Sequence, residues 1–171
     1  MTPTPIPTVH KLVQELLRDR DGASFGTILQ RYEKPSRDLE PYCNWNERHY
    51  TRTCIYRNEQ FELLVVCFEI GQCTSIHDYD SQTAFIKPVL GEVVEERFIQ
   101  LPNGSLDRTA ELHRPAGQMV QFTANDPIHR FINYGPGRAI TLNLYTKPMS
   151  RWRIYDERTG HSYFAPVGPV T

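Results

Sequence analysis

The sequence predicts an all-β fold, an antiparallel sandwich or barrel preceded by short N-terminal helices, from three observations. From Tyr50 onward, apolar residues recur with the two-residue period of strands. Turn-forming stretches such as Asn58-Glu59-Gln60 and Pro102-Asn103-Gly104-Ser105 separate these runs. Helical spacing of apolar residues is confined to the first forty residues. Many short strands without helices between them are typical of antiparallel sheets that pack together or close into a barrel.

The N-terminal region predicts an arm and two helices. Residues 1–8 alternate Pro with Thr or Ile, so we expect an extended arm, because proline fixes φ and lacks a backbone donor. Residues 9–20 predict a helix that covers one end of the barrel. A second helix is expected over 24–32, with Ser24 placed to cap its start. The apolar stripe of the first helix consists of Val9, Leu12, Val13, Leu16 and Leu17.

The remainder of the chain predicts strands alone. They are expected at 51–57, 61–69, 82–89, 92–99, 117–123, 128–134, 139–146, 151–156 and 161–166. The sequence contains no internal repeat and no composition break. We therefore expect one domain over residues 1–171, with the arm and helices in 1–40 and the barrel in 41–171.

Composition excludes several classes of protein. At 171 residues, a single domain buries roughly 70% of the surface of its unfolded chain. A hydrophobic fraction of 39% with 19 basic and 20 acidic residues indicates a soluble globular protein and argues against a nucleic-acid partner. No apolar run approaches the ~18 residues that span a bilayer, and the start lacks the features of a signal peptide. We expect no membrane association and a cytoplasmic location.

Four cysteines occur, namely Cys43, Cys54, Cys67 and Cys73. They form no Cys-x-x-Cys pair and the chain carries no sign of export, so reduced thiols are expected. Cys73 lies close to the candidate site described next, and we expect it to be a small buried residue.

Two stretches carry the residues of a candidate metal site. In the first, Gly71–Gly91, strand alternation turns His77 and Tyr79 to one face and Asp78 to the other. In the second, a strand carrying His129 can bring another imidazole to the same place. Imidazole is the commonest neutral nitrogen ligand for Fe, Zn, Cu and Ni. We predict that both imidazoles bind a metal ion.

Tyr79 leaves two alternatives for the third coordination position. A phenol has a pKa near ~10 and must lose its proton to be a strong ligand, a shift that a metal ion can supply. A bound phenolate favours the ferric state. Alternatively, Tyr79 only fills space and water takes the position. A carboxylate is not expected there, because the alternation turns Asp78 away and Asp80 also has the wrong parity.

The order Gly71, His77, Gly91 and then His129-x-x-x-Asn133 resembles the paired metal motifs of the cupin barrels. Within the cupins, the chain resembles the cysteine dioxygenase family of small iron enzymes over roughly residues 40 to 162. The resemblance implies a cupin fold, that is, a double-stranded β-helix or jelly-roll barrel. It is carried by His49-Tyr50-Thr51-Arg52, Ser75-Ile76-His77-Asp78, Asn125-Asp126, Ile128-His129-Arg130, Leu144-Tyr145 and Tyr155-Asp156-Glu157-Arg158-Thr159-Gly160-His161.

The chain departs from the family pattern at three positions. Tyr79 stands where the family has a further metal-binding His. Asn143 replaces the His that lies two residues before the active-site Tyr. Ala84 replaces the Cys that some members cross-link to that Tyr. It also occupies the place where many cupins carry a Glu ligand.

The resemblance also implies roles for residues on the other strands. Arg52, close to Tyr50, resembles the Arg that binds the substrate carboxylate, and a guanidinium grips a carboxylate with two hydrogen bonds. The alternative for Arg52 is a salt bridge at the barrel rim. Tyr145 resembles the active-site Tyr whose hydroxyl approaches bound thiol and oxygen. Thr141, Asn143 and Tyr145 fall on one strand face, in register with the family's Ser, His and Tyr. An amide can hold Tyr145 but cannot exchange protons as imidazole does.

The implied function is oxidation of the sulfur of L-cysteine, or of a related small thiol acid, by O2 in an Fe(II)-dependent monomer. The usual product is a sulfinic acid. One alternative carries the oxidation further, with decarboxylation or rearrangement towards a sulfonamide-like product. A second is a non-catalytic cupin that binds a small thiol or amino acid. A third is a sugar- or acid-modifying cupin without redox chemistry.

Overall fold

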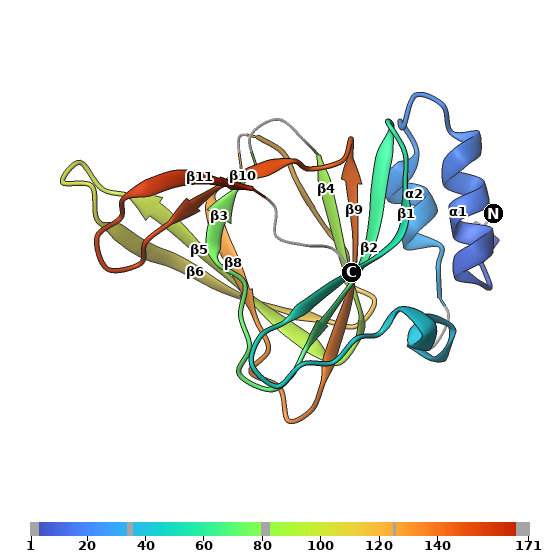
Figure 1. Cartoon of the computed structure of the whole chain (residues 1–171), viewed down its shortest axis with the longest axis horizontal. Coiled ribbons are helices and arrows are strands. Elements are labelled where there is room, and N and C mark those ends of the chain that lie inside the picture. The colour runs from blue at the N-terminus through green and yellow to red at the C-terminus, as the bar shows by residue number, and fades with distance from the viewer. Residues whose placement is uncertain (1–3, 34–35, 80–82, 125, 167–171) are drawn as a thin grey trace.

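The protein consists of two antiparallel sheets with helices on one side, in a computed structural model that describes residues 4–33, 36–79, 83–124 and 126–166 (Figure 1). The helices are α1 (Val9–Arg18), α2 (Phe25–Gln30) and the 3-10 helix η1 (Ser36–Tyr42). The strands are β1 (Thr51–Arg57), β2 (Phe61–Phe68), β3 (Ile76–Asp78), β4 (Ala84–Leu90), β5 (Glu92–Gln100), β6 (Leu106–Pro115), β7 (Val120–Phe122), β8 (Ile128–Ile132), β9 (Ala139–Thr146), β10 (Arg151–Tyr155) and β11 (Ser162–Pro166).

The two sheets face each other across a shared interior. One has the strand order β1-β2-β9-β4-β7, and the other has the order β11-β10-β3-β8-β5-β6. Apolar side chains from both sheets form one cluster, in which Leu64 and Ala139 of the first sheet join Val93 and Phe131 of the second. This arrangement is the predicted antiparallel barrel.

The first sheet is buried on both faces, because α1 and α2 cover its outer side (Figure 1). Every residue of β2 is buried. Alternate residues such as Leu63 and Val65 pack against the helices, while Leu64 and Val66 face the interior of the barrel. A strand buried on both faces loses the apolar-polar alternation of a surface strand, and β2 accordingly is apolar except for Glu62, which pairs with Arg57.

A buried lysine holds the helical layer to the sheet. The Nζ atom of Lys87 on β4 donates to the carbonyl oxygens of Leu29, Gln30 and Tyr32 at 3.2, 2.8 and 2.6 Å. Burial lowers the pKa of this ammonium group. The three carbonyls lie at the end of α2, where backbone acceptors lack helical partners and attract a cation.

The predicted helices and strands are present, most of them with shorter ends, whereas β4 and β5 each end one residue later than expected. The first helix stops at Arg18 rather than residue 20, and Thr8 caps its start by accepting from the backbone N of Lys11 at 3.1 Å. Ser24 is the N-cap residue of α2, as expected, but its side chain makes no capping hydrogen bond. Strands β1 and β9 have the predicted bounds.

Strand β6 was not predicted. Its sequence, from Leu106 to Pro115, is largely polar, and its residues are exposed or only half buried because β6 lies at the edge of its sheet.

All four cysteines are free, as expected. Cys73 is exposed, however, so the expectation that it is buried is wrong. No helix in the described ranges is long and apolar enough to cross a membrane. The assignment of the chain to one domain stays a prediction.

Two glycines of the Gly71–Gly91 stretch offer a matched test of the fold. Both have positive φ, 81° at Gly71 and 66° at Gly91. A Cβ at Gly91 would lie 2.7 Å from the carbonyl oxygen of Arg138, whereas a Cβ at Gly71 would meet nothing within 4 Å. We expect Gly71→Ala to lower the free energy of unfolding by about 1 kcal/mol, the cost of a left-handed alanine.

Gly91→Ala should cost clearly more, because the turn and the Arg138 backbone must also move apart. Urea denaturation of both variants measures the difference. Equal losses would contradict the close approach at Gly91.

Candidate metal centre and substrate pocket

Two imidazoles face each other inside the barrel. His77 on β3 and His129 on β8 are directly paired across the antiparallel ladder. Their ring centroids lie 4.6 Å apart, and the residues are only 2% and 1% exposed. Residues 52 positions apart in sequence are therefore brought together by strand pairing alone.

Backbone carbonyls fix which nitrogen of each ring is available. The Nδ1 atom of His77 lies 2.7 Å from the carbonyl oxygen of Ser75, and that of His129 lies 3.1 Å from the carbonyl oxygen of Pro127. Since a carbonyl only accepts, Nδ1 must carry the proton in both rings. Burial lowers the pKa of His129 to about 4 and that of His77 well below its usual value, so both rings are neutral at pH 7. Each Nε2 atom therefore carries a lone pair.

Tyr79 joins this pair from the end of β3. Its hydroxyl lies 3.5 Å from Nε2 of His77, and its ring centroid lies 5.2 Å from that of His129. Burial, followed by the neighbouring Tyr145, raises the pKa of Tyr79 well above 10. The phenol thus keeps its proton unless a cation binds beside it.

Asp78 points away from the imidazoles, as strand alternation predicts. Its Oδ2 accepts from the hydroxyl of Tyr155 at 2.7 Å, and its Oδ1 lies 3.3 Å from Nε of Arg153. Asp80 lies outside the described residues. Both carboxylate oxygens of Asp78 therefore contact side chains of β10, and Asp78 does not contribute to the site.

This donor set fits a transition-metal ion. Among described side chains, Nε2 of His129 is buried without a hydrogen-bond partner, an arrangement that is costly unless something else satisfies it. No group of three or more His, Cys, Asp or Glu residues in those parts of the chain is placed to hold a metal ion. The available donors are thus two imidazole nitrogens and the oxygen of Tyr79. Such a set suits Fe, Zn, Cu or Ni better than Mg or Ca.

The opposite sheet contributes a row of polar side chains on β9. Thr141 donates from Oγ1 to Oδ1 of Asn143 at 2.7 Å, and Nδ2 of Asn143 donates to the hydroxyl oxygen of Tyr145 at 3.1 Å. All three side chains are buried. Tyr145 lies across from Tyr79, with 5.9 Å between ring centroids. Ala84 on β4 is the strand partner of Tyr145, so a methyl group stands beside this phenol.

Arg52 and Tyr50 bring the substrate-binding candidates to the same place. Arg52 is only 9% exposed and lines the same cavity as His77. Tyr50 stacks on Phe68 with 5.5 Å between ring centroids. A cavity of about 20 Å³ lies between the two sheets here. It is lined by Tyr50, Arg52, Val66, Thr74, His77, Tyr79, Phe131, Asn143, Tyr145 and Trp152.

Comparison with known proteins places this arrangement in a family. The family model described as "Cysteine dioxygenase type I" matches residues 2–158. The chain belongs to the cysteine dioxygenase type I family. It is 28% identical to human cysteine dioxygenase type 1 over 138 residues, which are 78% of this chain and 69% of the human protein. It is 29% identical to the Danio rerio protein of the same name over 165 residues, 91% of this chain and 79% of the relative.

Solved structures agree on the fold. A double-stranded β-helix protein from Klebsiella pneumoniae is 14% identical, with a TM-score of 0.55 over 77% of this chain and 89% of its own. The protein TT1209 from Thermus thermophilus is 17% identical, with a TM-score of 0.54 over 65% of this chain and 95% of its own. These likenesses establish the cupin fold predicted from the sequence.

Two aromatic residues of this family member's site were missed by sequence reasoning. Trp152 lies against His77, with ring centroids 4.7 Å apart, and Phe122 stacks on His129 at 4.2 Å. A signal for Trp152 was present, since it shares a strand face with Ile154, the partner of His77 on β3. That partnership depends on strand register, which the sequence did not show.

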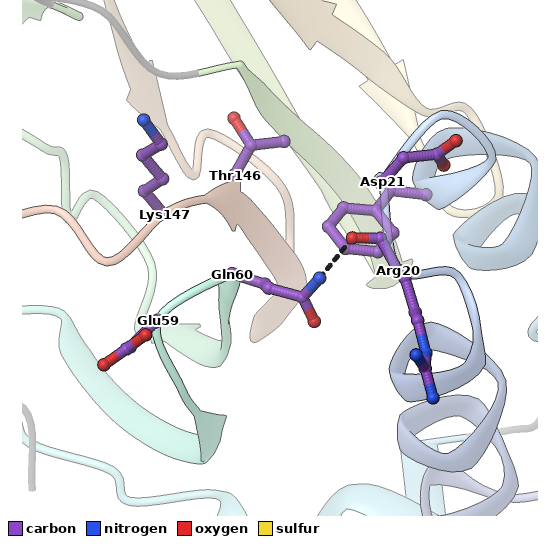
Figure 2. Close-up of a pocket in the computed structure, with 8 residues that line it drawn as sticks. Arg20, Asp21, Glu59, Gln60, Thr146 and Lys147 are labelled. Atoms are coloured by element: carbon purple, nitrogen blue, oxygen red, sulfur yellow. Dashed lines mark hydrogen bonds between the residues drawn. The ribbon is translucent and has the colours of Figure 1, made fainter.

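A larger hollow of about 320 Å³ lies elsewhere, between the α1–α2 connection and the loops that follow β1 and β9. Gln60 donates from Nε2 to the backbone carbonyl of Arg20 across it (Figure 2). The charged ends of Arg20, Glu59 and Lys147 point in different directions (Figure 2). None of the predicted site residues lines this hollow, and its charges do not converge on a common point.

We expect His77→Gln and His129→Gln each to weaken metal binding by at least about 100-fold, because a neutral amide oxygen is a poor replacement for an imidazole nitrogen toward such ions. Titration of the metal-free protein with Co(II), followed by calorimetry, measures this. His113→Gln is the matched control, since its ring lies on the exposed face of β6 and contacts Glu92. Unchanged Co(II) affinity in both variants would contradict metal binding by His77 and His129.

Proposed function

We propose that this protein is a non-haem iron dioxygenase that oxidises the sulfur of L-cysteine, or of a closely related small thiol acid, to the sulfinic acid. One observation carries the proposal. His77, the strand partner of His129, lines a cavity that the guanidinium of Arg52 and the phenol of Tyr145 also line. Membership of the cysteine dioxygenase family supports the same reaction.

Nε2 of His77 and Nε2 of His129 would hold the iron, with the oxygen of Tyr79 as the third donor. When bound by such a set, non-haem iron supplies the activation of O2 next to a coordinated thiolate. The backbone carbonyls of Ser75 and Pro127 orient the rings and keep Nδ1 protonated. The alternative is that Tyr79 only fills space and that water completes the coordination.

Arg52 would bind the substrate carboxylate. A guanidinium is always charged and offers two parallel donors, so it fixes both the position and the orientation of a carboxylate. Its burial strengthens this interaction, since the local dielectric constant is lower than that of water. With the carboxylate held at Arg52 and the imidazoles on the other sheet, an acid that bridges them presents its sulfur beside His77 and His129.

Tyr145 would stabilise negative charge on the reacting oxygen or sulfur. Because its oxygen accepts from Nδ2 of Asn143, its own proton remains available to donate. A donor fixed in a dry pocket is more effective than water, since no reorganisation is needed as charge develops. Asn143 and Thr141 hold the phenol in place but cannot pass protons along the row as an imidazole does.

The reaction is balanced without an external reductant. Both atoms of O2 are added to the thiol sulfur, which loses four electrons, and O2 gains the same four. The thiol hydrogen remains in the sulfinic acid product. The polypeptide therefore has to bind the thiol acid and O2, orient them and exclude water, which matches a small buried site.

Incubation of the iron-loaded protein with L-cysteine and isotopically labelled O2 tests the function. We expect oxygen uptake and cysteine sulfinic acid carrying both labelled atoms, identified by mass spectrometry. A decarboxylated, sulfonamide-like product would instead favour deeper oxidation of the same substrate. Protein that retains neither iron nor oxygen uptake would be a non-catalytic binding cupin. Oxygen-independent turnover of a sugar or other acid would likewise exclude the dioxygenase.

Tyr79→Phe tests the third donor. If the phenol oxygen binds iron, its loss should weaken Co(II) affinity by about 10-fold or more, while leaving both imidazoles in place. Affinity within about twofold of the original would favour the water-completed site. Tyr79→His is the complementary variant. If a phenolate alters the product, this change should shift it towards sulfinate.

A further inference from the structure

We propose that the indole of Trp152 is the size filter of the pocket, and that it must shift to admit an acid as small as cysteine. This inference rests on the proposed function, because it names the class of acid that the same site accepts. The filter would restrict the enzyme to thiol acids of about cysteine's length.

The position of the indole carries the first step. Cζ of Arg52 lies 5.6 Å from the centre of the Trp152 ring, and the centroid of the His77 ring lies 4.7 Å from that of Trp152. One side chain therefore touches both the proposed carboxylate anchor and a proposed metal ligand. A substrate that spans from Arg52 to the imidazoles must lie against this indole. A longer acid would have to occupy part of the space that it fills.

The size of the cavity carries the second step. Its volume of about 20 Å³ holds on the order of one water molecule. A cysteine zwitterion is several times larger. Binding of any thiol acid at Arg52 therefore requires one of the lining side chains to move.

The strand pairing indicates which side chain this is. Val66, Asn143 and Tyr145 project from β2 and β9, which are paired on both sides within the first sheet. In contrast, β10 pairs with β3 only through residues 153–155, and β3 ends at Asp78. Trp152 is therefore paired on one side only, with Ala165 of the edge strand β11. Tyr50 and Tyr79 also line the cavity from positions outside the strands, but Trp152 is the side chain that contacts both Arg52 and His77.

Substitution should change the preference for substrate length. For Trp152→Leu, we expect the ratio of kcat/KM for homocysteine, one methylene longer, to that for cysteine to rise by at least about 10-fold, as one methylene in an apolar pocket can decide a factor of this order. Trp152→Phe should give a smaller rise and keeps an aromatic ring for folding. Trp45→Leu is the matched control, because Trp45 stacks on Arg138 at 4.4 Å outside the pocket and should leave the ratio unchanged.

The shift itself can be observed without turnover. The sequence contains two tryptophans, so Trp45→Phe leaves Trp152 as the sole indole reporter. With anaerobic iron-loaded protein, we expect L-cysteine to move the Trp152 emission to longer wavelength as the ring becomes hydrated. Calorimetry on the same sample records whether cysteine binds.

The outcomes separate the two proposals. Cysteine binding with fixed emission and an unchanged homocysteine-to-cysteine ratio would overturn the size filter and leave the dioxygenase intact. A wild-type protein that neither binds nor oxidises cysteine would overturn both. A raised ratio together with shifted emission would support both.

Discussion

The register between β3 and β8 is the constraint on which the site depends. A shift of one residue would turn His77 or His129 to the other face of the sheet, since side chains alternate along a strand. Strand β3 has only three residues, yet the pairing continues beyond it. The backbone N of Thr74 donates to the carbonyl of Phe131 at 2.9 Å, and the N of Gly71 donates to the carbonyl of Asn133 at 2.8 Å. The loop before β3 thus sets the register of the strand.

Asn133 secures the other end of this pairing. Its fully buried side chain donates to the carbonyl oxygens of Phe68 and Gly137 at 3.2 and 2.8 Å and accepts from the backbone N of Gly135 at 3.0 Å. One amide therefore joins the end of β8 to the opposite sheet and to the following turn. Three satisfied hydrogen bonds would be hard to reproduce with another side chain, which gives the His129-x-x-x-Asn133 pattern a structural basis.

The sequence predicted those parts of the site that follow from strand parity. Alternation placed His77 with Tyr79, turned Asp78 away, and aligned Thr141, Asn143 and Tyr145. Parity within one strand does not fix which residues of two strands face each other. Strand parity therefore could not predict the contact between Trp152 and His77 or the small size of the cavity. Strand β6 was missed for a different reason, since an edge strand with two exposed faces carries little apolar signal.

The departures from the family pattern cluster around one phenol. Asn143 donates to the Tyr145 oxygen, Tyr79 lies across the cavity from it, and Ala84 is its strand partner. Each replacement changes the surroundings of Tyr145 while leaving the barrel intact. The two polar neighbours offer hydrogen bonds but no group that gains or loses a proton near neutral pH in the absence of metal.

The methyl group of Ala84 has a consequence for how the protein reaches its working form. A phenol with a thiol beside it can become covalently bonded to that thiol in an oxidising active site. Molecules of different age then differ in mass and activity. Next to an alanine, Tyr145 has no such partner at that position. A newly folded molecule therefore needs no covalent bond at this position, and stored protein does not accumulate a second form that carries one.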